Sequence, residues 1–273
     1  MLWSLLALLT VGSAPVPPLQ LNAICFGIGG GIGLIWVTAT GGFGALRAVP
    51  LQVYAFGTIG LFGYHLLYFS ALRMAPAAEA GLIAYLWPLL IVLLSGLLPG
   101  ESLRPQHIFG GLVGFAGAAL IVSSGATGFS AAALPGYGLA LLCAVTWAVY
   151  SVMSRRWGDV PTGSVTVFCL ATALLSLAAH FLWETTVWPA NPMGWISVLA
   201  LGAGPVGLAF FIWDIGVKKG DIQLLGVASY AAPLLSTLAL IMAGIAKPTA
   251  TLAVAACLIA GGAALAASAA RKP

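Results

Sequence analysis

Rings with polar tips recur through the long apolar stretches of the chain. The candidates for a binding site are Tyr64, His65, Tyr68, Tyr85, Trp87, Pro88, Trp147, Trp213 and Tyr230. Tyr64 and Tyr68 are four residues apart and share a helix face, with His65 on the same flank. Such rings stack on planar or apolar groups, and their faces attract an ammonium group by about 0.5 to 2 kcal/mol. They predict a cavity for a small solute, although many of them could simply pack a helical bundle.

Two prolines are expected to interrupt helices beside these rings. Pro88 follows Tyr85 and Trp87, and Pro233 follows Tyr230 at the same spacing as Pro88 follows Tyr85. Proline has no N–H, so Pro88 frees the carbonyl of Ala84 one turn back. Within a membrane, a freed acceptor is tolerated where protein or a watery cavity satisfies it. Both breaks are therefore predicted to border the path of a solute.

Titratable groups inside the apolar stretches are few, because an ionised side chain at the bilayer centre costs at least about 2.5 to 3.5 kcal/mol. His65 is the one at clear mid-depth, and it could bind substrate, take a proton or be a neutral core histidine. Glu79 and Asp214 lie near the ends of their stretches, where either could be solvated; they are further candidates for ion coupling. Asp214 also precedes Lys218 by four residues, which suits a helical ion pair.

Catalytic and metal-binding signatures are missing from the sequence. It has no P-loop, no His-Glu-x-x-His zinc motif and no Gly-x-Ser-x-Gly elbow, and its four cysteines form no metal or redox pair. His65, His107 and His180 differ too much in span and depth to form a catalytic set, and His107 and His180 are expected at the interface. The sequence predicts no catalytic residue, metal or cofactor. An integral-membrane lipid enzyme is the less favoured alternative.

The elements that must position these residues are membrane-spanning helices. Only 16 of 273 residues are charged, against roughly 25% in soluble domains, so the net charge of +4 gives no indication of nucleic-acid binding. Each span needs about 20 apolar residues. Cutting at proline, glycine and charge clusters predicts an all-α integral membrane protein with ten spans, at 1–13, 18–40, 51–73, 77–98, 106–124, 134–155, 161–183, 192–214, 221–244 and 249–270. The first of these is short.

Positive charges divide unequally between the two sides of this arrangement. One side holds Arg47, Arg104, Arg155, Arg156, Lys218, Lys219, Arg271 and Lys272. The other side has Arg73 and Lys247. Because Lys and Arg favour cytoplasmic loops, both termini are predicted to be cytoplasmic. The absence of an Asn-x-Ser/Thr acceptor fits a bacterial inner membrane.

A shift of 145 positions superimposes one half of the chain on the other. It aligns Gly81, Tyr85, Pro88, Leu89, Leu90 and Leu93 with Gly226, Tyr230, Pro233, Leu234, Leu235 and Leu238. The same shift places residues 117–120 on the identical residues 262–265. The shift equals five spans with their loops. Because five is an odd number, the second copy would enter the membrane from the opposite side. The sequence predicts two inverted five-helix repeats, at 1–125 and 134–270, the arrangement of many transporters.

These features resemble the drug/metabolite transporter superfamily, whose members carry two EamA-type repeats of five helices. A narrower likeness, to its aromatic amino acid exporters, rests on Tyr85-Leu86-Trp87-Pro88-Leu89-Leu90, Trp213-Asp214-Ile215-Gly216, Gly220-Asp221 and the stretch from Ser229-Tyr230 through Pro233 to Ser236. The resemblance implies a basket of ten helices, alternating access and export of aromatic amino acids. Export of cationic drugs or other metabolites remains an alternative. We expect a monomer in the bilayer with a small-molecule substrate.

Overall fold

The described part of the computed structural model comprises residues 2–123, 130–242, 244 and 247–270. Every regular element within these ranges is helical, which confirms the all-α prediction. Arg271 and Lys272, counted above for orientation, lie outside the described residues, as do residues 124 and 125 at the end of the first predicted repeat.

The chain forms two compact units, each made of two separate stretches of sequence. Unit 1 combines Met1–Leu66 with Trp157–Ile215. Its helices are α1 (Leu6–Gly12), α2 (Pro18–Ala39), α3 (Phe43–Arg47), most of α4 (Leu51–Met74), α9 (Ser164–Trp183), α10 (Pro192–Ala203) and most of α11 (Ala209–Lys219). A 3-10 turn over Leu2–Leu5 precedes α1, and a π-helical turn over Gly204–Leu208 joins α10 to α11.

Unit 2 combines Leu67–Arg156 with Gly216–Pro273. Besides the ends of α4 and α11, it holds a 3-10 turn over Ala131–Ala133 and the helices α5 (Ala77–Ala84), α6 (Trp87–Ser95), α7 (Pro105–Val122), α8 (Leu134–Arg156), α12 (Ile222–Ala228), α13 (Ala231–Met242) and α14 (Ala250–Ala270). Each unit therefore takes helices from both halves of the sequence.

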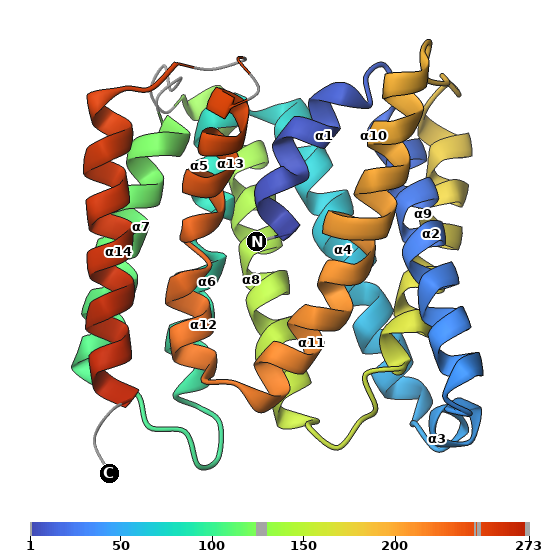
Figure 1. Cartoon of the computed structure of the whole chain (residues 1–273), viewed down its shortest axis with the longest axis horizontal. Coiled ribbons are helices and arrows are strands. Elements are labelled where there is room, and N and C mark those ends of the chain that lie inside the picture. The colour runs from blue at the N-terminus through green and yellow to red at the C-terminus, as the bar shows by residue number, and fades with distance from the viewer. Residues whose placement is uncertain (1, 124–129, 243, 245–246, 271–273) are drawn as a thin grey trace. The chain divides into compact units, whose positions relative to one another are not determined.

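Glycines let helices approach closely within each unit. In unit 2, α7 runs beside α14 (Figure 1), and a Cβ on Gly110 would lie 2.6 Å from the carbonyl oxygen of Gly262. In unit 1, α2 lies along α9 and also contacts the π turn, where a Cβ on Gly29 would lie 2.6 Å from the Cα of Gly207. By contrast, a Cβ on Gly31 would meet nothing within 4 Å.

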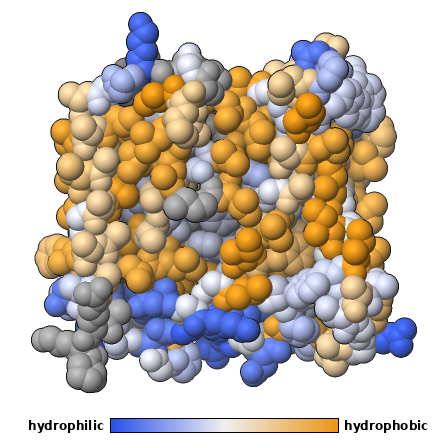
Figure 2. All heavy atoms as spheres, in the orientation of Figure 1, coloured by the Kyte–Doolittle hydropathy of each residue, from blue (hydrophilic) through white to orange (hydrophobic). Residues whose placement is uncertain are grey.

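Most of the surface visible in Figure 2 is apolar, and hydrophilic side chains gather near the edges of this view. Large apolar side chains such as Met242, at 83% exposure, point outward. Among the described residues, eight helical segments are long and apolar enough to cross a membrane, and two shorter apolar segments cover Leu2–Gly12 and Glu79–Ser95. An outward surface of this kind is stable in lipid, so the protein is a multi-pass membrane protein.

Two segments of unit 2 are broken helices, as the prolines predict. The first stops at Ala84 and resumes at Trp87, so that Pro88 is the second residue of α6, where a missing N–H costs no helical hydrogen bond. The other stops at Ala228 and resumes at Ala231, close before Pro233. The breaks place Tyr85 and Tyr230 at the joints between half-helices.

Candidate functional site

The residues predicted to bind a solute are divided between the two units, and each unit holds a ring cluster that includes some of them. Tyr64, His65 and Trp213 lie in unit 1. Tyr68, Tyr85, Trp87, Pro88, Trp147 and Tyr230 lie in unit 2.

His65 is the centre of the cluster in unit 1. Its ring meets Phe26 edge to face at 5.0 Å between centroids, with Tyr64 at 5.2 Å and Phe210 at 6.1 Å. Nδ1 lies 2.7 Å from the carbonyl oxygen of Leu61, one helical turn back. A carbonyl can only accept, so Nδ1 carries a proton and donates it to this carbonyl. The cluster thus combines apolar ring faces with a histidine whose ring is oriented by the backbone.

Trp3 and Trp213 extend this cluster. Trp3 packs on Trp213 at 5.1 Å and on Phe210 at 6.3 Å. Its indole Nε1 donates to the carbonyl of Pro205 at 3.0 Å, within the π turn. Phe26 stacks on Phe210 at 5.2 Å. Sequence reasoning missed Trp3 and Phe26, because Trp3 lies in a short first span and Phe26 has no polar tip.

Trp87 and Trp147 anchor the cluster in unit 2. Their rings meet edge to face at 6.3 Å, and Trp147 stacks on Tyr150 at 5.2 Å. Trp87 is 7% exposed and Trp147 is 3% exposed. Tyr68 lies on the unit 2 part of α4, with Phe69 beside it. The two indoles are therefore held by α6 and α8 in one fixed orientation.

Tyr230 links the two broken helices of unit 2. Its side chain is fully buried, and its hydroxyl accepts a hydrogen bond from the backbone N–H of Leu89 at 3.1 Å. Tyr85 and Leu89 pack against the core cluster to which Tyr230 belongs. The ring of Tyr230 also meets Phe115 on α7. Tyr230 therefore accepts a hydrogen bond from the backbone of α6 and also lies at the joint between α12 and α13.

The two candidate carboxylates are both buried, which corrects the expectation that either could be solvated. Glu79 is 1% exposed in the first turn of α5. Asp214 is 2% exposed, and it accepts a hydrogen bond from the Thr162 hydroxyl at 2.7 Å, because the segment before α9 reaches over it. Among the residues that the structure describes, no group of three or more His, Cys, Asp or Glu side chains could hold a metal ion.

His180, which is expected at the interface, is buried within unit 1. It is 2% exposed, and its Nδ1 lies 3.0 Å from the carboxylate of Glu184. That carboxylate accepts hydrogen bonds from the backbone N–H groups of Leu19 and Gln20. Both N–H groups lie in the first turn of α2, where a helix offers them no carbonyl partner of its own. The predicted interfacial histidine is thus part of a buried cap on α2. His107, expected to be interfacial as well, is 4% exposed at the start of α7.

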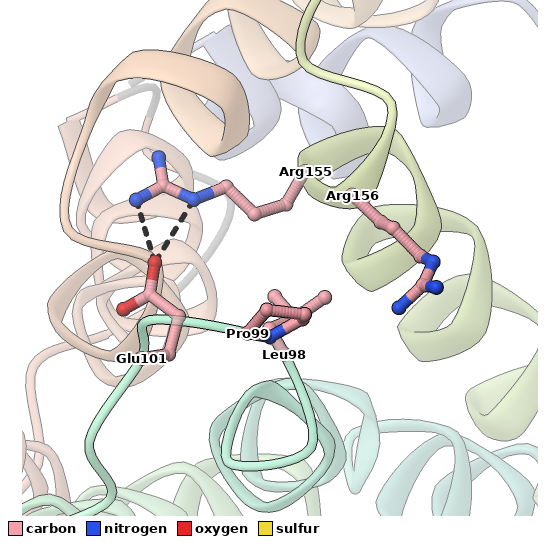
Figure 3. A pocket seen from close by; sticks show the side chains of 5 residues that line it. All are labelled: Leu98, Pro99, Glu101, Arg155 and Arg156. Atoms are coloured by element: carbon pink, nitrogen blue, oxygen red, sulfur yellow. Dashed lines mark hydrogen bonds and ion pairs between the residues drawn. The ribbon is translucent and has the colours of Figure 1, made fainter.

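An open pocket of about 350 Å³ lies at one end of unit 2. Arg155 and Glu101 point toward each other across it, and Arg156 points away from that pair (Figure 3). Arg155 donates to Glu101 at 2.6 and 3.0 Å. Its Nη1 also donates to the carbonyls of Val217, Lys218 and Gly220, at the end of α11. Arg155 thereby ties α8, the α6–α7 loop and the α11–α12 turn together.

Known proteins are similar to this chain along nearly its whole length. The EamA-like transporter family matches residues 1–123 and 134–268. The aromatic amino acid exporter YddG of Ancylobacter novellus is 55% identical over 100% of this chain and 95% of its own length. YddG of Salmonella typhimurium is 27% identical over 72% of this chain and 71% of its own length. A solved crystal structure, 55% identical, superimposes with a TM-score of 0.94 over all of this chain and 95% of that one.

The family match covers nearly the whole chain in two successive pieces, and its members are transporters. The predicted superfamily and the narrower likeness to aromatic amino acid exporters are both confirmed. The chain therefore belongs to the EamA-like transporter family, and it is a transporter and not an enzyme.

Proposed function

We propose that this protein exports aromatic amino acids and related small solutes by alternating access. The observation that carries the proposal is the full-length 55% identity to a protein named as an aromatic amino acid exporter. The two ring clusters give it a physical basis, because they combine apolar faces with a histidine, hydroxyls and indole N–H groups. Aromatic faces and directed polar groups together suit a solute with a planar side chain and a zwitterionic end.

The proposed architecture is ten membrane helices in two inverted five-helix repeats, at 1–125 and 134–270. Eight long and two short apolar helical segments in the described part of the chain support the count, and the two separate family matches support the division. The distribution of Lys and Arg favours a bacterial inner membrane with both termini in the cytoplasm. We expect the substrate path near the midplane, where inverted repeats generally place it, and a monomeric transporter.

Binding is assigned to Tyr64, His65, Tyr68, Tyr85, Trp87, Pro88, Trp147, Trp213 and Tyr230. Coupling to an ion gradient is assigned to His65, Glu79 and Asp214, because ionisable groups buried in a membrane protein commonly carry protons or bind ions. Substrate flux measured at several imposed pH gradients, with His65→Ala beside wild type, tests the coupling. A flux that does not respond to the gradient removes the proton role.

Substrate identity is tested in proteoliposomes with phenylalanine, tyrosine and tryptophan as labelled substrates and competitors. Trp87→Ala should reduce transport at least about tenfold, since removing a large aromatic contact costs more than about 1.4 kcal/mol. Trp188→Ala is the matched control, because Trp188 is 53% exposed and stacks only on Trp195 among the ring pairs described. If aromatic amino acids neither cross nor compete, the substrate assignment is wrong.

A further inference from the structure

The first turn of α6 is capped by a side chain from a distant part of the sequence. Because the preceding helix stops at Ala84, the first N–H groups of α6 have no carbonyl one turn back. Leu89 is the third residue of α6, and its N–H donates to the hydroxyl of Tyr230 at 3.1 Å. That hydroxyl comes from the joint between α12 and α13 and is fully buried. One broken helix is therefore capped by the tyrosine at the break of the other.

The internal repeat relates this hydrogen bond to a second, equivalent bond, which is called its image. The shift of 145 positions carries Tyr85 onto Tyr230 and Leu89 onto Leu234. The image of the bond between Tyr230 and Leu89 is thus a bond between the hydroxyl of Tyr85 and the N–H of Leu234. Tyr85, Leu89 and Leu234 all pack against the same small core cluster around Tyr230.

Only one of the two related bonds is made in this structure. Tyr230 binds Leu89, whereas no hydrogen bond joins Tyr85 to Leu234, both of which are described residues. In transporters built from inverted repeats, the two halves exchange conformations when the open side changes. The difference between the two equivalent tyrosines then belongs to one conformational state. In the state open to the other side, the bond that is missing here should form and the bond that is present here should break.

We infer that Tyr85 and Tyr230 are alternating caps, a positioning role that rests on the alternating access proposed above. In the state described here, the Tyr230 hydroxyl holds the first turn of α6. In the state open to the other side, the Tyr85 hydroxyl holds the first turn of α13, and Tyr230 releases Leu89. Each state thus gains one hydrogen bond and loses its image, which keeps the two states close in free energy.

Amide hydrogen exchange on the purified full-length chain in lipid nanodiscs tests the inference without a substrate. Tyr230→Phe removes one hydroxyl and keeps the ring. It should speed exchange in the first turn of α6 by roughly fivefold, the effect of one net hydrogen bond. It should also slow exchange in the first turn of α13, because the population moves to the state that Tyr85 caps. Tyr85→Phe should produce the opposite pair of changes.

The double variant Tyr85→Phe/Tyr230→Phe separates alternating caps from a static one. The protection that α13 gains in Tyr230→Phe should disappear when Tyr85 also loses its hydroxyl. Tyr137→Phe is the matched control: it removes a hydroxyl that accepts from the backbone N–H of Ser130 in the same unit, and it should alter neither turn. If α13 is unchanged in Tyr230→Phe, or stays protected in the double variant, Tyr230 is a static cap.

This result is independent of the substrate assignment, since no transport is measured. Failure of aromatic amino acids to cross the membrane would leave the exchange pattern intact. Failure of the exchange pattern would leave the transport result intact.

Discussion

At the scale of single residues, His65 has the most defined geometry of the proposed binding groups. Its Nδ1 is fixed by the carbonyl of Leu61, and Phe26 and Phe210 hold the ring from two directions. A ring held at that many points keeps its orientation when a solute arrives. We propose that the second ring nitrogen, Nε2, contacts the ammonium group of the amino acid in the bound state.

His65→Phe should weaken transport while keeping the ring packing. A hydrogen bond to a charged group is worth about 1.5 to 3 kcal/mol, so the KM for phenylalanine should rise about tenfold or more. The measurement is initial uptake against substrate concentration in proteoliposomes. An unchanged KM and an unchanged turnover would make His65 a core histidine with no part in binding.

At the scale of elements, Arg155 connects three segments of unit 2 that are far apart in sequence. Its guanidinium binds Glu101 and three carbonyls at the end of α11, and the exposed fractions of the two side chains are 25% and 17%. The planar guanidinium presents five N–H donors in a fixed fork, whereas the ammonium group of lysine has three donors on a single nitrogen. Gln223, in the first turn of α12, lies 3.4 Å from the second oxygen of Glu101. The end of α8 is thus an anchor for the broken helix α12–α13.

Arg155→Ala should lower the free energy of unfolding by about 1 to 3 kcal/mol, because it removes the arginine donors to a partly buried carboxylate and to three carbonyls. Thermal unfolding in detergent measures the change. Arg156→Ala is the control, since Arg156 is exposed beside the same pocket and should shift stability by no more than about 0.5 kcal/mol. Equal effects of the two variants would show that Arg155 does not anchor α12.

The close approach of α7 to α14 depends on Gly110. Gly110→Ala would place a Cβ 2.6 Å from the backbone oxygen of Gly262, so α7 and α14 must separate, and we expect a loss of about 1 to 3 kcal/mol. Gly31→Ala adds the same methyl group where nothing lies within 4 Å and should be neutral or slightly stabilising. Thermal unfolding of the two variants is compared. A Gly110→Ala variant as stable as wild type would contradict the close contact.

At the scale of the whole molecule, the apolar stretches were enough to predict an all-helical membrane protein, and the prolines at Pro88 and Pro233 were enough to predict the two breaks. Local patterns carry such information because helix formation and breaking depend on near neighbours. The partners of Arg155 could not be predicted, since they lie 54 to 65 residues away in sequence. The burial of His180 likewise depends on the distant start of α2.

Counterflow of phenylalanine tests the central claim, export of aromatic amino acids by alternating access, most directly. Proteoliposomes containing the protein are loaded with unlabelled phenylalanine and diluted into labelled phenylalanine at a much lower concentration. An alternating-access transporter exchanges the two, so the label should accumulate transiently above its external concentration and then decline. Liposomes without protein and the Trp87→Ala variant should show little of this overshoot. If the wild-type label rises only to equilibrium, or does not enter, the central claim is contradicted.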